Sequence, residues 1–282
     1  MINPQKLIYN DEEINSYLNE FNVILDVSFD SDNGATSSFL NRSAVAAESH
    51  DGRYKNTHKY KYDELFSPQF TFVKQDFSDF SQSEVRKVLK YLTQTDKPAL
   101  IEVSYDKDGD VTAEEDRDFC AVGGWTNIEL YKIANSRTVG IIATFEAVTP
   151  YAMSTLHEIP ITQSDSYKKT ITVYTDDNSP IYPYIKITKG NAAGTVTITN
   201  QHSYLDEDSD PVTTEIKNNS RNEIIELDGA NGIISSSSTK RIFGSDFNWV
   251  WLPLYDGDND ITVTGNCSVT LKFREIRKIG EW

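Results

Sequence analysis

The amino-acid sequence predicts a mainly β protein with one α-helix, built as two domains. Most of the 282 residues fall in short segments that alternate apolar and polar side chains, which is the period of half-buried strands. Only residues 81–95 have the period of an amphipathic helix. The chain is 38% hydrophobic and 11% aromatic, so it can bury two cores of ordinary size.

The first domain is predicted to begin with antiparallel strands around a turn at Asn10-Asp11. Its expected strands are residues 7–9, 14–18, 23–29, 70–72, 99–105, 119–132 and 137–147. Gly123-Gly124 is expected to form a β-bulge within 119–132, and Asn135-Ser136 the turn after it. These strands form an antiparallel sheet with one covering helix.

The predicted helix, residues 81–95, covers this sheet. Ser81 and Glu84 have the spacing of a capping box, in which each side chain accepts a hydrogen bond from a backbone N–H at the start of the helix. The apolar residues that share one face are Val85, Val88, Leu89 and Leu92. The basic residues opposite them are Arg86, Lys87 and Lys90. Pro98, which has no backbone donor, closes the element.

Residues 35–63 have little periodicity and are expected to form a long loop or arm. Within them, residues 53–61 interleave basic and aromatic side chains, which is a pattern that can contact nucleic acid. The sequence has no recognition helix or single-strand-binding signature, so contact with an acidic neighbouring subunit is the preferred interpretation. This loop is expected to be mobile in the isolated protein and ordered in an assembly.

The composition changes after residues 149–153, so the expected domains are residues 1–155 and 156–282. The second domain is predicted to contain no helix. Its expected strands are residues 171–174, 182–188, 195–200, 213–217, 223–227, 249–254, 261–264 and 269–274. Turns are expected at residues 191–194, 228–232 and 256–259. This spacing is typical of a β-sandwich.

Charge and composition exclude several functions. The net charge is −16, from 27 Lys and Arg against 43 Asp and Glu, which disfavours tight binding to nucleic acid. No apolar run is long enough to cross a bilayer, and Met1-Ile2-Asn3-Pro4 lacks the pattern of a secretory signal, so we expect synthesis and first use in a cytoplasm. Cys120 and Cys267 are expected to be buried small hydrophobes without a disulfide.

Motifs for catalysis or metal binding are missing or broken. Residues 106–110 alternate carboxylates like a calcium loop, but Gly109 stands at the fourth position rather than the sixth, and no Glu stands at the twelfth. The histidines are scattered, and Pro160 prevents a helical zinc pair after His157. We therefore assign no catalytic, cofactor-binding or metal-binding residue and expect a protein that is not an enzyme.

Aromatic residues near the end of the chain could offer flat faces to sugar rings. They are Trp249, Trp251, Tyr255 and Trp282. Trp249 and Trp251 share one face of the strand predicted at 249–254, where aromatic side chains commonly fill a sandwich core, so burial is the preferred interpretation.

In the order of its segments the chain resembles the distal tail proteins of siphophages, which join a phage tail tube to its baseplate or tail tip. The matching segments are Tyr9-Asn10, Ile14, 23–27, 70–73, 79–81, 84–92, 98–103, 145–153, 182–187, 252–259, Ile261, Gly265 and 269–274. This pattern of short anchors covers nearly the whole chain. It departs from the family in two places: no Gly follows Asn10, which affects only the turn type, and residues 35–63 are an elaboration.

The resemblance implies an N-terminal ring-forming belt domain and a C-terminal galectin-like β-sandwich. It implies a homohexameric ring around the DNA channel, between tail-tube protein and a tail-associated hub protein, with receptor-binding proteins on the outer domain. The implied location is the virion tail, assembled in the bacterial host cytoplasm, without membrane insertion; DNA would pass without specific binding. The galactoside motifs of galectins are broken after His202 and Trp251, so the outer domain is expected to dock proteins.

The first hypothesis is therefore a non-enzymatic virion structural protein, the distal tail hub. The alternative is a carbohydrate-binding tail adhesin whose sandwich contacts host cell-wall saccharide through Trp249 or Trp251. A tail-associated hydrolase ranks last because no catalytic constellation can be named.

Overall fold

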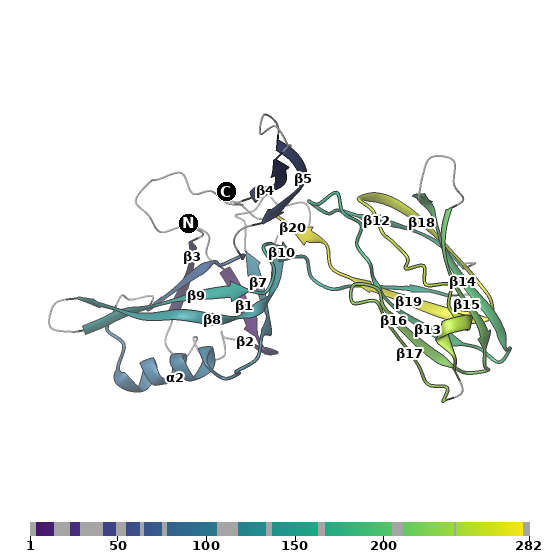
Figure 1. The fold of residues 1–282 in the computed structure, drawn as a ribbon. Helices are drawn as coiled ribbons and strands as arrows, with labels where there is room; N and C mark the ends of the chain where they lie inside the picture. Colours follow the sequence, from purple (N-terminus) through teal and green to yellow (C-terminus); the bar gives the residue numbers. More distant parts are fainter. Residues whose placement is uncertain are drawn as a thin grey trace. The chain divides into compact units, whose positions relative to one another are not determined.

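The computed structural model describes residues 4–13, 23–28, 42–48, 55–62, 65–74, 78–105, 118–133, 137–162, 167–204, 211–239 and 241–278. The chain divides into two compact units (Figure 1). The first unit contains the described residues up to Thr155 together with Lys278, and the second unit runs from Leu156 to Arg277. Each unit has its own hydrophobic core. Strands predominate, so the predicted mainly β class is confirmed.

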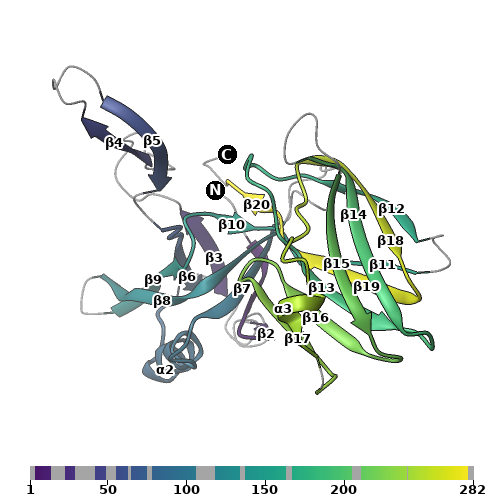
Figure 2. The same ribbon diagram turned by 45° about the vertical axis from the view of Figure 1, so that its right-hand side comes forward.

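The first unit is built on an antiparallel sheet in the strand order β2-β1-β7-β8-β9-β6-β3 (Figures 1 and 2). The strands are β1 (Pro4–Tyr9), β2 (Glu12–Glu13), β3 (Val23–Ser28), β6 (Gln69–Lys74), β7 (Ala99–Tyr105), β8 (Asp118–Ile133) and β9 (Arg137–Ala147). The short β10 (Ala152–Met153) also pairs with β8. Most strands predicted for this unit are confirmed. The predicted strand at 14–18, the turn at Asn135-Ser136 and the carboxylates at 106–110 lie outside the described residues.

The turn between β1 and β2 explains why no glycine is needed after Asn10. Asn10 and Asp11 have positive φ angles of 53° and 63°, as both central residues of a type I′ turn require. Asn and Asp adopt this left-handed conformation more readily than other residues except glycine. The Asn10 N–H also donates to Leu100 O at 3.0 Å, which ties the turn to β7.

The predicted helix is present as α2 (Gln82–Leu92), and its capping box is complete. The Ser81 N–H donates to Glu84 Oε2 at 2.6 Å, and the Glu84 N–H donates to Ser81 Oγ at 3.3 Å. Lys74 Nζ lies 2.9 Å from Glu84 Oε1. Burial alone would raise the pKa of Glu84, but hydrogen bonds from Lys74 and Ser81 lower it overall. The cap therefore also anchors the helix to β6.

The buried face of α2 differs in part from the predicted stripe. Val88 and Leu92 are buried as predicted, but Tyr91 is buried as well while Leu89 is only half-buried. The Tyr91 hydroxyl donates to Glu12 O at 2.9 Å, which ties α2 to β2. A pattern of purely apolar residues does not mark Tyr91 as buried, because tyrosine combines an apolar ring with a polar hydroxyl that needs a hydrogen-bond partner.

An aromatic cluster fills the centre of the first unit. The ring centroid of Trp125 lies 5.1 Å from that of Phe70, 5.4 Å from that of Phe145 and 5.9 Å from that of Tyr9. All three contacts are edge-to-face, which is a favoured arrangement of aromatic pairs. The cluster joins β1, β6, β8 and β9 across the sheet.

Gly123 allows β8 and β9 to approach closely. A Cβ atom built at Gly123 would lie 2.1 Å from Glu146 O and 2.8 Å from Ala147 Cα. The bulge predicted at Gly123-Gly124 is wrong, because both glycines stay in register with β9. The register shifts further along, around Asn127, whose φ is 45°. Gly123 therefore serves close packing, and an asparagine, Asn127, takes the bulge conformation.

Residues 35–63 are not simply the unpatterned loop that the sequence predicts. β4 (Arg42–Glu48) and β5 (Lys55–Tyr62) pair as an antiparallel hairpin (Figure 2). Among the described residues, neither strand is hydrogen-bonded to a third strand. Pairing between the two strands defines this element.

The second unit is a sandwich of two antiparallel sheets (Figures 1 and 2). The five-stranded sheet contains, in spatial order, β11 (His157–Ile161), β19 (Cys267–Phe273), β13 (Tyr184–Lys189), β16 (Ile224–Asp228) and β17 (Ile233–Ser236). The four-stranded sheet contains β12 (Lys168–Val173), β18 (Gly257–Thr264), β14 (Gly194–Tyr204) and β15 (Pro211–Asn219). The short strand β20 (Ile276–Arg277) follows β19.

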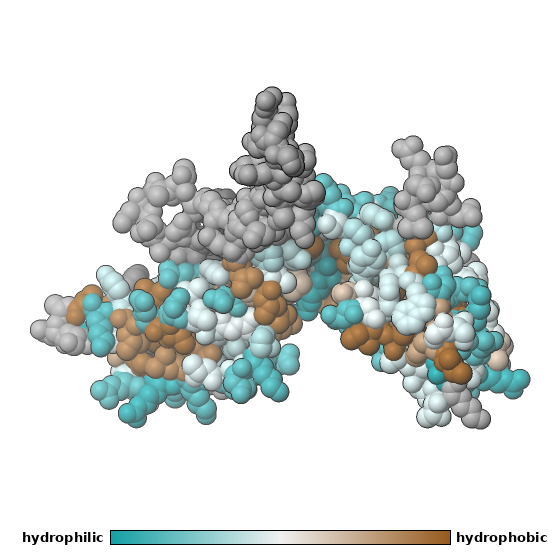
Figure 3. Space-filling model, in the orientation of Figure 1, coloured by the Kyte–Doolittle hydropathy of each residue, from teal (hydrophilic) through white to brown (hydrophobic). Residues whose placement is uncertain are grey.

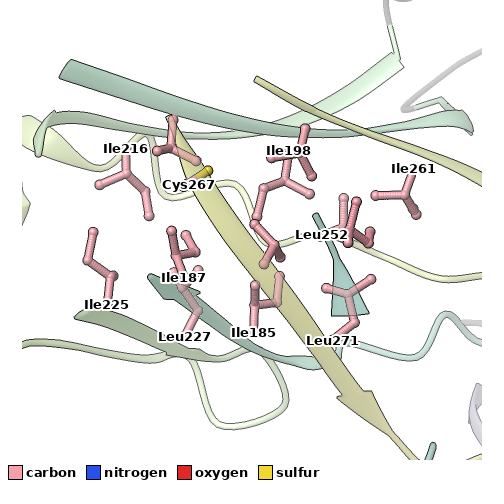
Figure 4. Packing of buried hydrophobic residues seen from close by; sticks show 14 of the residues in the cluster. Ile185, Ile187, Ile198, Ile216, Ile225, Leu227, Leu252, Ile261, Cys267 and Leu271 are labelled. Atoms are coloured by element: carbon pink, nitrogen blue, oxygen red, sulfur yellow. The ribbon is translucent and has the colours of Figure 1, made fainter. Parts of the chain in front are cut away.

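Branched aliphatic side chains from both sheets meet between the layers. Figure 4 shows Ile198 and Ile216 of the four-stranded sheet facing Ile185 and Ile187 of the five-stranded sheet, and each is at most 2% exposed. Cys267 belongs to this core and Cys120 is buried in the first unit, which confirms that both are small buried residues. Burial raises the pKa of the Cys267 thiol.

The second domain differs from the prediction in five places. The structure adds β11, β17 and a short helix α3 (Phe243–Asp246), none of which was predicted. Residues 249–254 are not a strand, since only a single bridge joins Leu254 to Ile181. The turn expected at 256–259 is shorter than predicted, because β18 already starts at Gly257. The two-layer architecture nevertheless agrees with the prediction.

Candidate assembly surfaces

The histidines, which are common metal ligands, are dispersed. His157 Nε2 lies 3.6 Å from Glu275 Oε2, and His202 Nε2 lies 3.3 Å from Asp260 Oδ2. His58 lies on β5, and His50 is outside the described residues. Within the described ranges no three His, Cys, Asp or Glu side chains come together as a metal site requires. None of the described helices is long and apolar enough to span a membrane.

The most buried charged cluster clamps the segment around α3 to β15 and β16. Arg241, whose side chain is 3% exposed, donates to Glu223 Oε1 from Nε at 3.0 Å and from Nη2 at 2.7 Å. Its Nη1 donates to Asp246 Oδ2 at 3.1 Å and to Lys217 O at 2.6 Å, and Nη2 also donates to Asn219 Oδ1 at 2.7 Å. A buried cation with this many acceptors fixes a segment rigidly.

Both carboxyl groups of this cluster have a lowered pKa. Burial alone would raise the pKa of Glu223, but hydrogen bonds from Ser236, the Ser220 N–H and Arg241 lower it overall. The pKa of Asp246 is lowered first by its hydrogen bond from Asn218 and further by Arg241. The cluster is therefore held in its ionised form at neutral pH and acts as a structural clamp.

The segment after α3 covers the free edge of β15. The Asn248 N–H donates to Glu215 O at 3.1 Å, and its Oδ1 accepts from the Glu215 N–H at 3.1 Å. The Asn248 Nδ2 donates to Thr213 O at 2.8 Å. The side chain thus substitutes for a neighbouring strand, which protects an edge that would otherwise pair with another chain.

Trp249 and Trp251 do not share a strand face, contrary to the prediction. Trp251 is partly buried against the sandwich core, with its ring centroid 5.2 Å from that of Phe247. Trp249 is 53% exposed and has a φ of 59°. Positive φ is rare for a bulky residue and costs about 1–3 kcal/mol, so it persists only where the surrounding structure enforces it. Tyr255 is half-buried, and Trp282 lies outside the described residues.

The outward face of the four-stranded sheet is polar. Its residues bond to each other across the strands: Thr172 donates to Asp258 at 2.7 Å, and the hydroxyls of Thr197 and Thr264 lie 2.6 Å apart. Further outward residues are Lys168, Thr170, Thr195, Thr199, Gln201, Thr213, Glu215, Lys217, Asp260 and Thr262. None of these side chains is aromatic, so this part of the described surface lacks a flat platform for a sugar ring.

The far half of β8 exposes apolar residues on both of its faces. Leu130, 38% exposed, lies on the face towards the start of α2, and Tyr131 and Ile133, 57% and 40% exposed, lie on the opposite face, because successive residues of a strand alternate. Figure 3 shows hydrophobic residues gathered where β8 and α2 lie. A cavity of about 510 Å³ lies between the start of α2 and the far end of the β8–β9 pair, and it is lined in part by Val85, Leu130 and Arg137. Exposed apolar patches of this kind mark protein-binding surfaces.

Free strand edges are a second type of surface in the first unit. β2 and β3 end the described strand order, and β8 pairs with β7 only up to Gly123, so its far half is hydrogen-bonded to β9 alone among the described residues. Unpaired N–H and C=O groups along such edges can accept a strand from another chain.

Two protein-family models together match nearly the whole chain. A domain family described as phage tail protein N-terminal domain matches residues 7–149, and one described as phage tail C-terminal domain matches residues 151–273. A search of curated proteins gave no significant match.

A search of solved structures matched two that cover nearly the whole chain. The crystal structure of SPP1 Dit, described as a paradigm of hub adsorption apparatus in Gram-positive infecting phages, has a TM-score of 0.59 at 9% identity, covering 95% of this chain and 98% of that chain. A chain of the phage P2 baseplate in its activated conformation with Ca has a TM-score of 0.46 at 9% identity, covering 96% of this chain and 98% of that chain.

Proposed function

We infer the function from the premise that this chain belongs to the phage tail protein family whose N-terminal and C-terminal domains match residues 7–149 and 151–273. It is accordingly a structural protein of the virion tail. Within the tail, we propose that it is the distal hub, a non-enzymatic part that joins the tail tube to the baseplate or tail tip.

One observation carries this proposal above all others. The fold of the whole chain, and not of one domain, is similar to that of SPP1 Dit, since the alignment covers 95% of this chain and 98% of the other. Both the sheet-and-helix unit and the sandwich are therefore included. At 9% identity the likeness concerns the fold alone, and the step from fold to hub is an analogy. We propose that residues 1–155 are the belt domain and residues 156–282 the galectin-like domain.

We further propose that the belt domains close into a homohexameric ring. A ring needs a heterologous interface, in which one patch of each copy fits a different patch of the next. The first unit offers suitable patches: the edges of β2, β3 and the far half of β8 that have no partner strand among the described residues, and the exposed apolar residues Leu130, Tyr131 and Ile133. The net charge of −16 suits a channel through which DNA passes without adhering.

The partners that follow from this role are other tail proteins. We propose that the ring stacks on tail-tube protein on one side and on a tail-associated hub protein on the other. The sandwich would carry receptor-binding proteins. Its rigid clamp around Arg241 and its covered β15 edge support a platform that presents surfaces without changing shape.

One observation favours the alternative of a carbohydrate-binding adhesin. Trp249 is exposed and is held at positive φ by a segment that Asn248 fixes on β15. The outward face of the four-stranded sheet does not favour this alternative, because its outward residues include no aromatic side chain on which a sugar ring could stack. A glycan array separates the two functions: binding by the native protein that is lost in a folded Trp249→Ala variant would establish the adhesin, whereas no binding by either protein supports the hub.

The decisive test of the hub is the assembly state of the purified full chain. We expect light scattering to give the mass of six copies and electron microscopy to show a six-fold ring with an open centre. Wall-degrading activity of the purified chain, or a compact monomer both at high concentration and after mixing with the tail-tube and tail-associated hub proteins, would contradict the proposal.

A further inference from the structure

The sandwich has four sheet edges, and three of them are protected against pairing with another chain. Natural proteins block edge strands with lysine, with proline or with a covering segment. β12 carries Lys168 and Lys169, and β11 carries Pro160, which has no N–H to offer. β15 is covered by the Asn248 side chain. The fourth edge, β17, has the sequence Ile-Ile-Ser-Ser and no partner strand beyond it among the described residues.

The backbone groups that β17 presents at this edge follow from its pairing with β16. The Ser237 N–H donates to Ile224 O at 2.9 Å, and hydrogen-bonded pairs alternate along an antiparallel ladder. The backbone N–H and C=O of Ser235 therefore face β16, whereas those of Ile234 and Ser236 face the free edge. Within the described part of the chain, these edge groups make no backbone hydrogen bond. They can accept a further strand.

The two faces of this edge favour different neighbouring residues. Towards the interior, Ile234 packs partly against the core of the sandwich, so an apolar neighbour would extend that packing. Towards solvent, Ile233 is 59% exposed. On the same outward face of the neighbouring strand β16, Glu226 lies opposite Ser235. Asp228 lies opposite Ile233.

These two carboxylates make the outward face beside β17 acidic. Tyr184 of β13 lies opposite Asp228, and its pKa is raised by burial, by its hydrogen bond to Glu226 and by the charges of both carboxylates. Lys186 lies opposite Glu226 on β13, on the side away from β17. Neighbouring strands lie about 4.8 Å apart, so a lysine or arginine on a strand added at β17 spans most of the distance to the carboxylates from the free side.

We propose that the β17 edge binds an extended segment of another protein, which adds a sixth strand to the five-stranded sheet. The segment has apolar residues on the face beside Ile234 and a basic residue on the outward face, within reach of Glu226 and Asp228. A second copy of β17 fits less well, because it offers no cation to these carboxylates. Since β17 has only four residues, the side chains contribute much of the affinity and the specificity. This inference goes beyond the hub and does not depend on a ring.

A short synthetic strand tests the edge in the full-length protein. The probe is the fluorescently labelled peptide Lys-Val-Thr-Val-Lys-Val-Thr, whose valines share one face while its lysines lie on the other. We expect saturable binding by fluorescence polarisation. The peptide Lys-Val-Thr-Pro-Lys-Val-Thr has the same charge but a broken strand, and Glu-Val-Thr-Val-Glu-Val-Thr has the opposite charge, so each should bind at least about tenfold more weakly.

Two variants of the edge act by different routes. Ile234→Pro removes an N–H that faces the free edge and leaves the ladder to β16 in place. Ser235→Lys adds a charge that repels the probe and neutralises Glu226. Each should weaken binding at least about tenfold. The matched control is Thr195→Lys, an exposed position on the other sheet, which should stay within about twofold of wild type. Circular dichroism verifies that all three fold.

Hydrogen exchange locates the bound peptide. Amides in residues 233–236 should exchange more slowly when the probe is bound to wild type, and those of β12 should not change. Absence of binding, equal binding of the peptide with the broken strand, or undiminished binding by the folded Ser235→Lys variant would overturn the proposal. Self-association of wild type that Ser235→Lys abolishes would also overturn it, in favour of a second copy at this edge. A failed β17 edge leaves the proposed hub standing, because the test uses no ring.

Discussion

Replacing Arg241 by methionine tests the clamp of the sandwich most sharply. Methionine keeps most of the volume of the side-chain stem but removes every donor that Arg241 offers to Glu223, Asp246 and Asn219. The Glu223 carboxylate, 1% exposed, would then be buried without its cation. Loss of one partner of a buried ion pair costs about 3–5 kcal/mol. For a domain of this size that lowers the midpoint of thermal unfolding by roughly 10–20 °C.

Hydrogen exchange in increasing urea measures this loss in the sandwich alone, because peptides from β13, β16 and β19 belong only to that unit. The matched control is Lys272→Met. Lys272 pairs with Glu158 at 2.8 Å, but both side chains are substantially exposed, so the loss should be below about 1 kcal/mol. A loss below about 1 kcal/mol for Arg241→Met as well would refute the clamp.

The same cluster sets a dependence on pH. The pKa of Glu223 is lower in the folded chain than its ordinary value of 4.5, so on acidification the unfolded chain takes up the proton first. The stability that Glu223 contributes is therefore complete above pH 4.5 and is lost as the pH falls through the folded-state pKa. The free energy of unfolding of the sandwich should fall more steeply with acid in wild type than in Glu223→Gln. Parallel slopes would contradict this assignment.

Four further substitutions probe local features. Ser81→Ala removes one half of the capping box and should lower the stability of the first unit by about 1 kcal/mol in urea unfolding; no change would mean that Lys74 and Glu84 alone hold the start of the helix. Gly123→Ala forces a Cβ against the backbone of β9 and should cost more than about 3 kcal/mol or prevent folding, whereas Gly124→Ala, which meets no atom within 4 Å, should be tolerated. Trp249→Gly should keep or raise the stability of the sandwich, since glycine adopts positive φ without strain, and a clear loss would show that the exposed ring supports the fold.

Elements encoded by local chemistry could be predicted from the sequence. The start of α2 follows from Ser81 and Glu84, since capping involves residues three apart in the chain. Ala99–Tyr105 and Arg137–Ala147 were predicted with the bounds that β7 and β9 have, because an apolar face of period two is itself the signal.

Elements whose stability comes from distant partners could not be predicted. β11 contains Pro160, which argues against a strand, but β11 lies at a sheet edge, where a missing N–H is tolerated. The sequences of β4 and β5, rich in alanine and in lysine and tyrosine respectively, do not alternate apolar and polar residues as a half-buried strand does. Their pairing in the structure is what identifies them as strands. Residues 249–254 have a strand-like composition, but the positive φ of Trp249 breaks the extended backbone.

The surfaces that carry the proposed function leave weaker marks in the sequence. The basic character of 53–61 was visible, and it pointed to an acidic neighbouring subunit, which stays a prediction. The exposed Trp249 was mistaken for a core residue, since its exposure depends on the Asn248 contacts with β15. The exposure of the end of β8 has no signal in the sequence, because Ile128 and Leu130 alternate with polar residues as they would in a half-buried strand.

The location of the chain in the assembled particle tests the central claim most directly. Gold-labelled antibodies raised against the purified protein, bound to intact virions and viewed by electron microscopy, should mark one position at the distal end of the tail, between the tube and the tip. Label spread along the tube, or confined to fibres beyond the tip, would contradict the assignment of this chain as the distal hub.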